Sequence, residues 1–176
     1  DKPAETIINN VVAQVHLLEA IRKVGLFNCR VLVVSSADVY GKVAKEDLPI
    51  DEDTEFNPTN AYAVSKIAQD FLGLQYMLSY NMKIIRARPF NHIGPRQSLG
   101  YVVADFAQKI AKIEKGLQEP LLTVGNLEAR RDFTDVRDMT RAYELLIRFG
   151  KPGEVYNIGS GKSYAISEIL NMFLSL

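Results

Sequence analysis

The sequence predicts an α/β fold with a mainly parallel sheet and helices on both faces. Segments with the apolar spacing of helices alternate with short apolar runs of strand length. The run Arg30–Ser35 (RVLVVS) is rich in β-branched residues, which is typical of a strand buried on both faces. No internal repeat or low-complexity tract interrupts this alternation.

The individual elements follow from apolar spacing and from turn residues. Ile8, Val11, Val15, Leu18 and Ile21 predict a first helix that ends at Gly25. A long polar loop over residues 41–60 follows the first strand, and loops of this length are usually functional or disordered. The remaining predictions are a helix over about 61–80, a strand over 83–88, a helix ending near Gly116, a strand over 121–124, a helix from Asp135 to Gly150, a strand over 155–158 and a last helix after Gly161.

Composition narrows the functional classes. The 21 basic residues balance the 21 acidic ones, so we expect no nucleic acid or anionic membrane as a partner. The single cysteine, Cys29, excludes an internal disulfide framework and fits a reducing compartment, and we expect a cytoplasmic protein. No apolar run approaches the length of a membrane span, and His and Cys show no metal-ligand spacing, so no metal site is expected.

A first candidate cluster, Ser35-Ser36-Ala37-Asp38-Val39-Tyr40-Gly41, lies where the buried strand ends. Ligands of open α/β sheets bind outside the carboxyl ends of the strands, where a hydroxyl can donate to a substrate oxygen. The alternative is that the serines only cap the turn after the strand.

A second candidate cluster is Tyr62 with Lys66, four residues apart on one face of a helix. An ammonium beside a phenol favours the phenolate and lowers the phenol pKa from about 10 towards working pH. Such a tyrosine can exchange a proton with a substrate oxygen while hydride moves at carbon. The alternative is an ordinary surface Tyr–Lys pair.

Together the two clusters resemble the extended short-chain dehydrogenase/reductase (NAD-dependent epimerase/dehydratase) family, and the resemblance covers the whole chain. Further segments carry it: Asn9–Val12 with Leu17–Ala20, Arg88–Pro95 (RPFNHIGP) and Arg131–Asp138 (RDFTDVRD). Within the family, the runs 86–96 and 124–138 are most similar to GDP-4-dehydro-6-deoxy-D-mannose reductases. The resemblance implies part of a Rossmann-type domain over residues 1–89, and a mixed segment over 90–176 with substrate-binding elements and returning strands and helices.

The resemblance also implies roles for individual residues. Ser36, Tyr62, Lys66 and Asp38 are expected to be catalytic; Asn10, Ser36, Tyr62, Lys66 and Pro89 to bind NAD or NADP; and Ser35, Ser36, Asn91 and Arg131 to bind the sugar nucleotide. A guanidinium at position 131 suits a diphosphate, because its fork matches two phosphate oxygens. His92 is expected to contribute backbone or packing only.

Two phosphate-binding motifs are missing from the chain. Gly161-Lys162-Ser163 is not a P-loop, because position 156 is Tyr where the motif needs Gly. The Gly-rich dinucleotide fingerprint is absent, and family members carry it before the point at which this chain begins. We therefore expect a fragment that lacks the N-terminal part of its cofactor site, and that is inactive alone.

The predicted reaction is reduction of the 4-keto group of a GDP-4-keto-6-deoxyhexose by NAD(P)H. Dehydratases of the family have glutamate where this chain has Asp38, and aspartate is shorter by about 1.5 Å. A GDP-mannose 4,6-dehydratase or a sugar-nucleotide epimerase stays an alternative, as does a non-catalytic cofactor- or nucleotide-binding protein. The resemblance also implies a homodimer through the first helix and the helix from residue 60.

Overall fold

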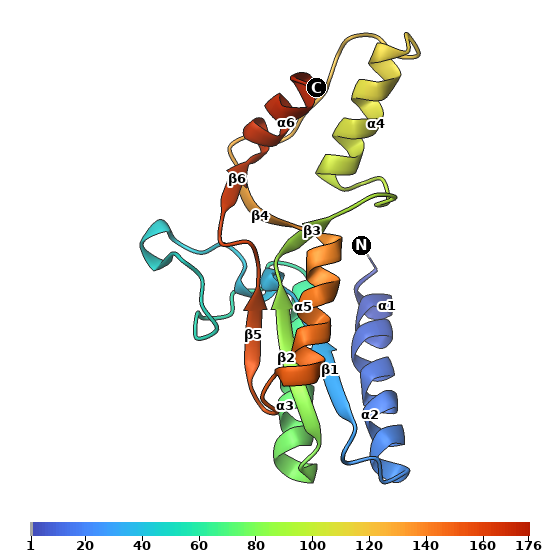
Figure 1. Cartoon of the computed structure of the whole chain (residues 1–176), viewed down its shortest axis with the longest axis vertical. Coiled ribbons are helices and arrows are strands. Elements are labelled where there is room, and N and C mark those ends of the chain that lie inside the picture. The colour runs from blue at the N-terminus through green and yellow to red at the C-terminus, as the bar shows by residue number, and fades with distance from the viewer. Residues whose placement is uncertain (1) are drawn as a thin grey trace. The chain divides into compact units, whose positions relative to one another are not determined.

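The computed structural model describes residues 2–176, which divide into two compact units (Figure 1). The first unit contains the chain up to Phe90 together with Met139–Ile158, and the second contains Asn91–Asp138 and Gly159–Leu176. The sequence-based division assigned a Rossmann-type part to residues 1–89 and substrate-binding elements with returning strands and helices to residues 90–176. That assignment of roles stays a prediction.

The first unit holds the main sheet and the helices beside it. Its elements are α1 (Pro3–Ile7), the π-helix η1 (Ile8–Val12), α2 (Ala13–Lys23), β1 (Arg30–Val34), the 3₁₀ turns η2 (Ala37–Tyr40) and η3 (Lys45–Asp47), α3 (Ala61–Tyr80), β2 (Lys83–Pro89), most of α5 (Val136–Phe149) and β5 (Val155–Ile158).

The main sheet has the strand order β1-β2-β5, and both of its pairings are parallel. Val34 is level with Ala87, and Arg86 is level with Val155. The carboxyl ends of β1 and β2 therefore meet at one edge of the sheet. This confirms the predicted α/β class with a parallel sheet.

The core of the first unit lies between this sheet and α2 and α3. Leu18, Val33, Tyr76, Met82 and Ile84 form one buried cluster. Gly73 lets α3 approach closely, because a Cβ there would lie 3.1 Å from the Val33 side chain. At the other face, Gly150 after α5 meets Ile85, and Figure 1 shows α3 and α5 on opposite sides of the strands.

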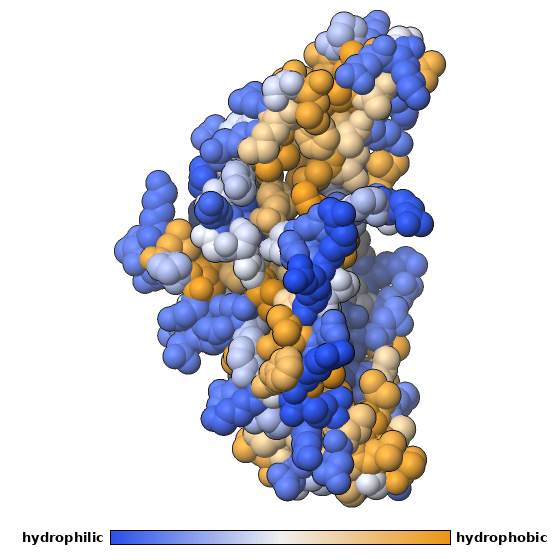
Figure 2. All heavy atoms as spheres, viewed as in Figure 1, coloured by the Kyte–Doolittle hydropathy of each residue, from blue (hydrophilic) through white to orange (hydrophobic). Residues whose placement is uncertain are grey.

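The second unit contains a smaller sheet and two helices. Its elements are β3 (Asn91–Ile93), α4 (Val102–Glu114), β4 (Arg130–Asp135), β6 (Ser163–Ala165) and α6 (Ile166–Leu174). The strand β4 pairs parallel with β3 and antiparallel with β6. Phe106 of α4 and Ile166 of α6 are buried, and Figure 2 shows apolar side chains gathered over these two helices.

The structure departs from the predicted elements in two places. The predicted strand over residues 121–124 is wrong: these residues have no regular structure, and Leu121 is 69% exposed because no strand pairs with them. The short strands β3, β4 and β6 were not predicted, since β4 (RRDFTD) is too charged to read as apolar. Within residues 2–176, no helix combines the length and hydropathy that a membrane span needs.

Candidate active site at the carboxyl edge of the main sheet

Ser35 and Ser36 follow β1 at the carboxyl edge of the sheet. Ser35 is buried: its N–H donates to the Ala87 carbonyl at 2.7 Å, and its Oγ donates to the Lys66 carbonyl at 3.0 Å. Its hydroxyl thus joins the strand to the helix α3. The expected substrate contact of Ser35 stays a prediction.

Ser36 caps the turn η2. Its backbone is extended, with φ −161°, and its Oγ accepts a hydrogen bond from the Asp38 N–H at 3.2 Å. Because the oxygen accepts here, the hydroxyl hydrogen remains able to donate to a ligand. Asp38 itself is exposed, whereas Val39 and Tyr40 fix the turn by burial.

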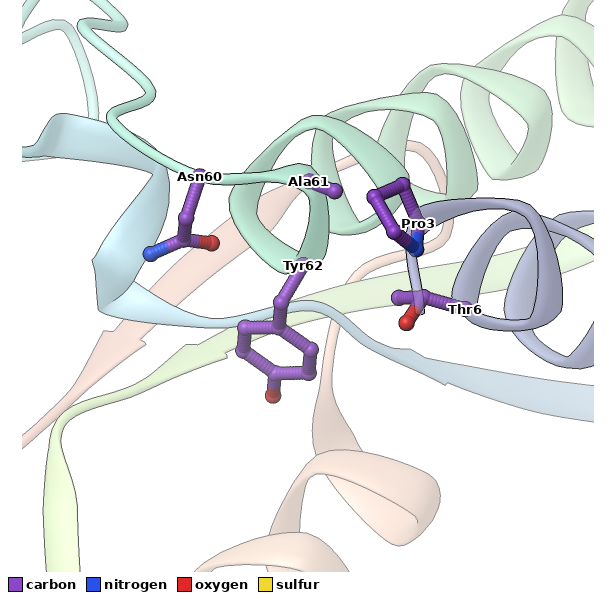
Figure 3. Close-up of a pocket in the computed structure, with 5 residues that line it drawn as sticks. All are labelled: Pro3, Thr6, Asn60, Ala61 and Tyr62. Carbon is purple, nitrogen blue, oxygen red and sulfur yellow. The ribbon is translucent and has the colours of Figure 1, made fainter. Parts of the chain in front are cut away.

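Tyr62 and Lys66 lie in the first two turns of α3. Asn60 starts this helix, because its Oδ1 accepts from the Ala63 N–H at 2.8 Å and satisfies one of the free donors of the first turn. The Tyr62 side chain is 42% exposed, and Figure 3 shows its ring extending away from Ala61 and Pro3. A pocket of about 200 Å³ beside it is lined by Pro3, Thr6, Asn60, Ala61 and Tyr62.

Lys66 reaches from α3 to the end of β1. Its Nζ donates to the Val34 carbonyl at 3.0 Å and lies 5.6 Å from the centre of the Tyr62 ring. Burial lowers the pKa of the Lys66 ammonium below its ordinary value. The two side chains thus lie on the same side of α3, one of the three ammonium hydrogens is used by the backbone, and the expected effect of Lys66 on the Tyr62 phenol stays a prediction.

Asn10 lies in the π-helix η1, and π-turns are frequent at functional sites. Its side-chain amide donates to Ser65 Oγ at 2.8 Å, and Ser65 Oγ donates to the Tyr62 carbonyl at 2.7 Å. The Gln69 amide donates to the Asn10 carbonyl at 2.9 Å. Asn10 thereby holds the helix segment that carries Tyr62, while its expected cofactor contact stays a prediction. Sequence reasoning missed Ser65 and Gln69, which no motif marks.

Pro89 ends β2 at the same edge as Ser36. Val34, the last residue of β1, is level with Ala87, so Ser36 lies two residues beyond the end of β1 and Pro89 two residues beyond Ala87. The sheet edge of the first unit therefore collects the expected residues from two neighbouring strands and from α3. A cofactor contact of Pro89 stays a prediction.

The expected substrate ligands Asn91 and Arg131 belong to the second unit, on β3 and β4. Asn91 is level with Phe133, so Arg131 lies two residues earlier on the neighbouring strand. Both are exposed, and Arg131 Nη1 donates to the Arg130 carbonyl at 2.7 Å. The small sheet thus brings Asn91 and Arg131 onto adjacent strands, and their substrate contacts stay predictions.

Asp132 organises the neighbouring turn of the second unit. Its carboxylate accepts from the N–H groups of Ser160 and Gly161 at 3.0 and 2.8 Å, and from Ser160 Oγ at 2.7 Å. The turn that resembles a P-loop in sequence therefore already binds an internal carboxylate. This agrees with the rejection of a P-loop there.

Comparison with known proteins places the chain in a family. The model of the family described as GDP-mannose 4,6 dehydratase matches residues 1–175. The chain belongs to this family. The expected resemblance to extended short-chain dehydrogenases/reductases is confirmed.

Both reductases and dehydratases are among the relatives that are similar to the chain. A GDP-6-deoxy-D-mannose reductase of Pseudomonas aeruginosa is 41% identical over 174 residues, which are 99% of this chain and 57% of that protein. A GDP-mannose 4,6-dehydratase of Vibrio cholerae is 30% identical over 171 residues, 97% of this chain and 45% of that protein. The chain thus spans about half the length of these relatives.

A solved structure agrees closely in fold. It is described as RMD from Pseudomonas aeruginosa complexed with NADPH; the TM-score is 0.92 at 42% identity, over 97% of this chain and 57% of that one. The chain therefore resembles this protein in its three-dimensional fold as well as in its sequence.

Proposed function

We propose that the protein is a nucleotide-sugar oxidoreductase that reduces the 4-keto group of a GDP-4-keto-6-deoxyhexose with NAD(P)H. The observation that carries this proposal is the approach of the Lys66 ammonium to the Tyr62 ring at 5.6 Å, at the sheet edge where Ser36 also lies. The 41% identity to a GDP-6-deoxy-D-mannose reductase supports the choice of substrate.

The three side chains divide the chemistry of the reduction. Ser36 donates a hydrogen bond to the keto oxygen, and Tyr62 gives that oxygen its proton as charge develops on it. Lys66 stabilises the resulting phenolate, because its half-buried ammonium keeps two hydrogens beyond the one donated to Val34. Asp38 is exposed beside Ser36 and is the further catalytic candidate.

The residues present suit the nicotinamide end of a dinucleotide. A half-buried lysine with hydrogens to donate, an amide at a π-turn and the end of a strand suit a ribose and a flat ring at a sheet edge. Lys66, Asn10 and Pro89 would hold that end, together with Ser36 and Tyr62. The nicotinamide supplies the hydride when it is bound.

The substrate's nucleotide belongs to the second unit in this proposal. Arg131 is exposed and can present its guanidinium to the diphosphate, and Asn91 on the adjacent strand can bind the sugar nucleotide. Ser35 is proposed to help bind the sugar of the substrate, because it lies next to Ser36 in the chain.

The decisive experiment offers two substrates to the full-length gene product. We expect oxidation of NADPH or NADH with the GDP-4-keto-6-deoxyhexose and no turnover of GDP-mannose. Turnover of GDP-mannose without net consumption of reduced cofactor would instead establish the dehydratase, which the 30% identity to the Vibrio cholerae enzyme keeps as the second candidate. Isomerisation of a GDP-hexose without net redox change would establish the epimerase.

A binding protein without catalysis is the candidate of another class. Such a protein has no need of the phenol, so Tyr62→Phe would leave its function intact. Retention of both Tyr62 and Lys66 favours the enzyme.

We further propose a cytoplasmic homodimer that associates through the first helical segment and α3. These elements pack side by side and expose apolar side chains: Ile8, Val12, Leu17, Val64, Phe71 and Leu78. Light scattering tests the dimer. Phe71→Glu is expected to give a monomer, whereas Leu121→Glu, at a still more exposed position of the second unit, is expected to leave the dimer intact.

A further inference from the structure

A buried ionic cluster lies between α3 and β2 in the first unit. Asp70 is 0% exposed, and its two carboxylate oxygens bind Arg86 at 2.6 Å and Arg88 at 2.8 Å. Both arginines are themselves buried. Buried charges persist only when they are paired and hydrogen-bonded, so this cluster is a built feature of the fold.

Arg88 has contacts that Arg86 lacks. Its Nη1 donates to Tyr40 Oη and to the Glu52 carbonyl, each at 2.8 Å, and its guanidinium lies 4.6 Å from the centre of the Phe56 ring. Arg86 turns instead to the Gly153 carbonyl, at 3.0 Å. Arg88 is therefore the arginine that links the cluster to the turn η2 and to the loop after it.

Tyr40 passes the connection onward. Its hydroxyl accepts from Arg88 and donates to Asn157 Oδ1 at 2.8 Å, while the Asn157 N–H donates to Glu52 Oε1 at 2.6 Å. Burial raises the pKa of the Tyr40 phenol, although Arg88 acts in the opposite direction. The phenol therefore stays protonated at neutral pH and can serve as donor.

The loop over residues 41–60 closes on the same turn. The Asn57 N–H donates to the Val39 carbonyl at 2.9 Å, and Gly41 has φ +61° with no room for a side chain, since a Cβ there would meet the Asn57 carbonyl. The turn is thus held from the loop side by backbone contacts and from the sheet side by Tyr40.

Both ends of this cluster lie on elements that carry expected catalytic residues. Tyr40 ends the turn that follows Ser36 and contains Asp38. Asp70 lies four residues after Lys66 and eight after Tyr62, on the same face of α3. Arg88 bridges these two elements, and at 4% exposure it is enclosed by protein.

The geometry points to Arg88 as a positioning residue that fixes the Ser36–Asp38 turn relative to the helix that carries Tyr62 and Lys66. The inference rests on the proposed function, in which Ser36 and Tyr62 act on one substrate oxygen. A loosened turn would misplace the Ser36 hydroxyl, and small misplacements of reacting groups are costly to rate.

Tyr40→Phe tests the inference in the full-length gene product, because it removes only the hydroxyl that joins Arg88 to the turn. We expect hydrogen–deuterium exchange at residues 36–41 to speed up about tenfold, because the variant loses the two hydrogen bonds of the hydroxyl, with Arg88 and with Asn157, and each contributes only modestly in net terms. We expect kcat to fall by about tenfold while KM for the reduced cofactor stays within about twofold, as for loss of transition-state positioning. Arg88→Lys is expected to act in the same direction, since an ammonium cannot bridge Asp70, Tyr40 and Glu52 together.

Arg86→Lys is the matched control. It keeps a cation beside Asp70 and has no contact with the turn, so exchange at residues 36–41 and kcat are expected to stay within about twofold of the original protein. Equal loosening and equal loss of kcat in Tyr40→Phe and Arg86→Lys would overturn the inference, because the cluster would then act only through general stability. An unchanged turn and unchanged kcat in Tyr40→Phe would overturn it as well.

Exchange separates this inference from the proposed function. If the original protein reduces no GDP-4-keto sugar, the proposed function fails, and the comparison of exchange at residues 36–41 still decides the role of Arg88. Loosening in Tyr40→Phe but not in Arg86→Lys supports the positioning role, and its absence contradicts it.

Discussion

Asp70→Asn is expected to be strongly destabilising, because Asp70 holds two buried arginines with one carboxylate. An amide keeps one acceptor oxygen and turns an NH₂ donor towards the second guanidinium, so at least one buried cation loses its charged partner. Breaking a buried ion pair from one side costs about 3–5 kcal/mol. The remaining bonds of the arginines to Gly153 and Tyr40 place the expected cost near the lower end, about 3 kcal/mol.

Urea unfolding followed by circular dichroism measures this loss. With a slope of about 2 kcal/mol per molar urea, the midpoint is expected to fall by about 1.5 M. Asp53→Asn makes the same chemical change at an exposed position of the 41–60 loop, and its expected cost of less than about 0.5 kcal/mol would shift the midpoint by less than about 0.25 M. If Asp70→Asn costs under about 1 kcal/mol, the account of a buried, mutually dependent charge cluster is wrong.

Three further predictions concern the helices and their charges. Glu19 accepts hydrogen bonds from Arg22 and Tyr76, and these bonds lower its pKa from 4.5 to about 2. The stability that the Glu19 carboxylate contributes is therefore full above pH 4.5 and is lost as pH falls towards 2. In denaturant titrations, Glu19→Gln should destabilise the protein at pH 7 but not at pH 2. Burial lowers the pKa of Lys66, so between the lowered pKa and 10.5 the unfolded chain binds more protons than the folded one. The free energy of unfolding, measured relative to Lys66→Met, should therefore rise with pH in that window. A fall with pH there would contradict the burial of Lys66. Asn60→Ala removes the cap of α3 and should cost about 1 kcal/mol in thermal unfolding, whereas Asn60→Asp should cost little.

The parts of the fold that depend on local pattern were predictable from the sequence. Residues 61–80 form one helix as expected, because Asn60 caps it and its apolar residues recur at helical spacing. The run Arg30–Val34 forms a strand, as its β-branched residues predicted. Residues 121–124 look equally apolar but remain irregular, since a strand exists only where a neighbour offers hydrogen bonds.

The candidate site divides in the same way. Tyr62 and Lys66 were predictable because four residues on a helix place two side chains on one face. The contact of Arg88 with Tyr40 joins positions 48 residues apart in sequence, and no local pattern encodes it. The π-turn that aims Asn10 at Ser65 was also invisible, since its sequence continues an ordinary helical repeat.

The central claim is that the Tyr62 phenol supplies the proton in carbonyl reduction. Single-turnover reduction of a GDP-4-keto-6-deoxyhexose by NADPH, compared between the full-length gene product and its Tyr62→Phe variant, tests it most directly. We predict that Tyr62→Phe lowers the rate of the chemical step by about 10²–10⁴-fold, while Tyr80→Phe, at the far end of the same helix, leaves it unchanged. A chemical step in Tyr62→Phe within a factor of about three of the original would contradict the claim.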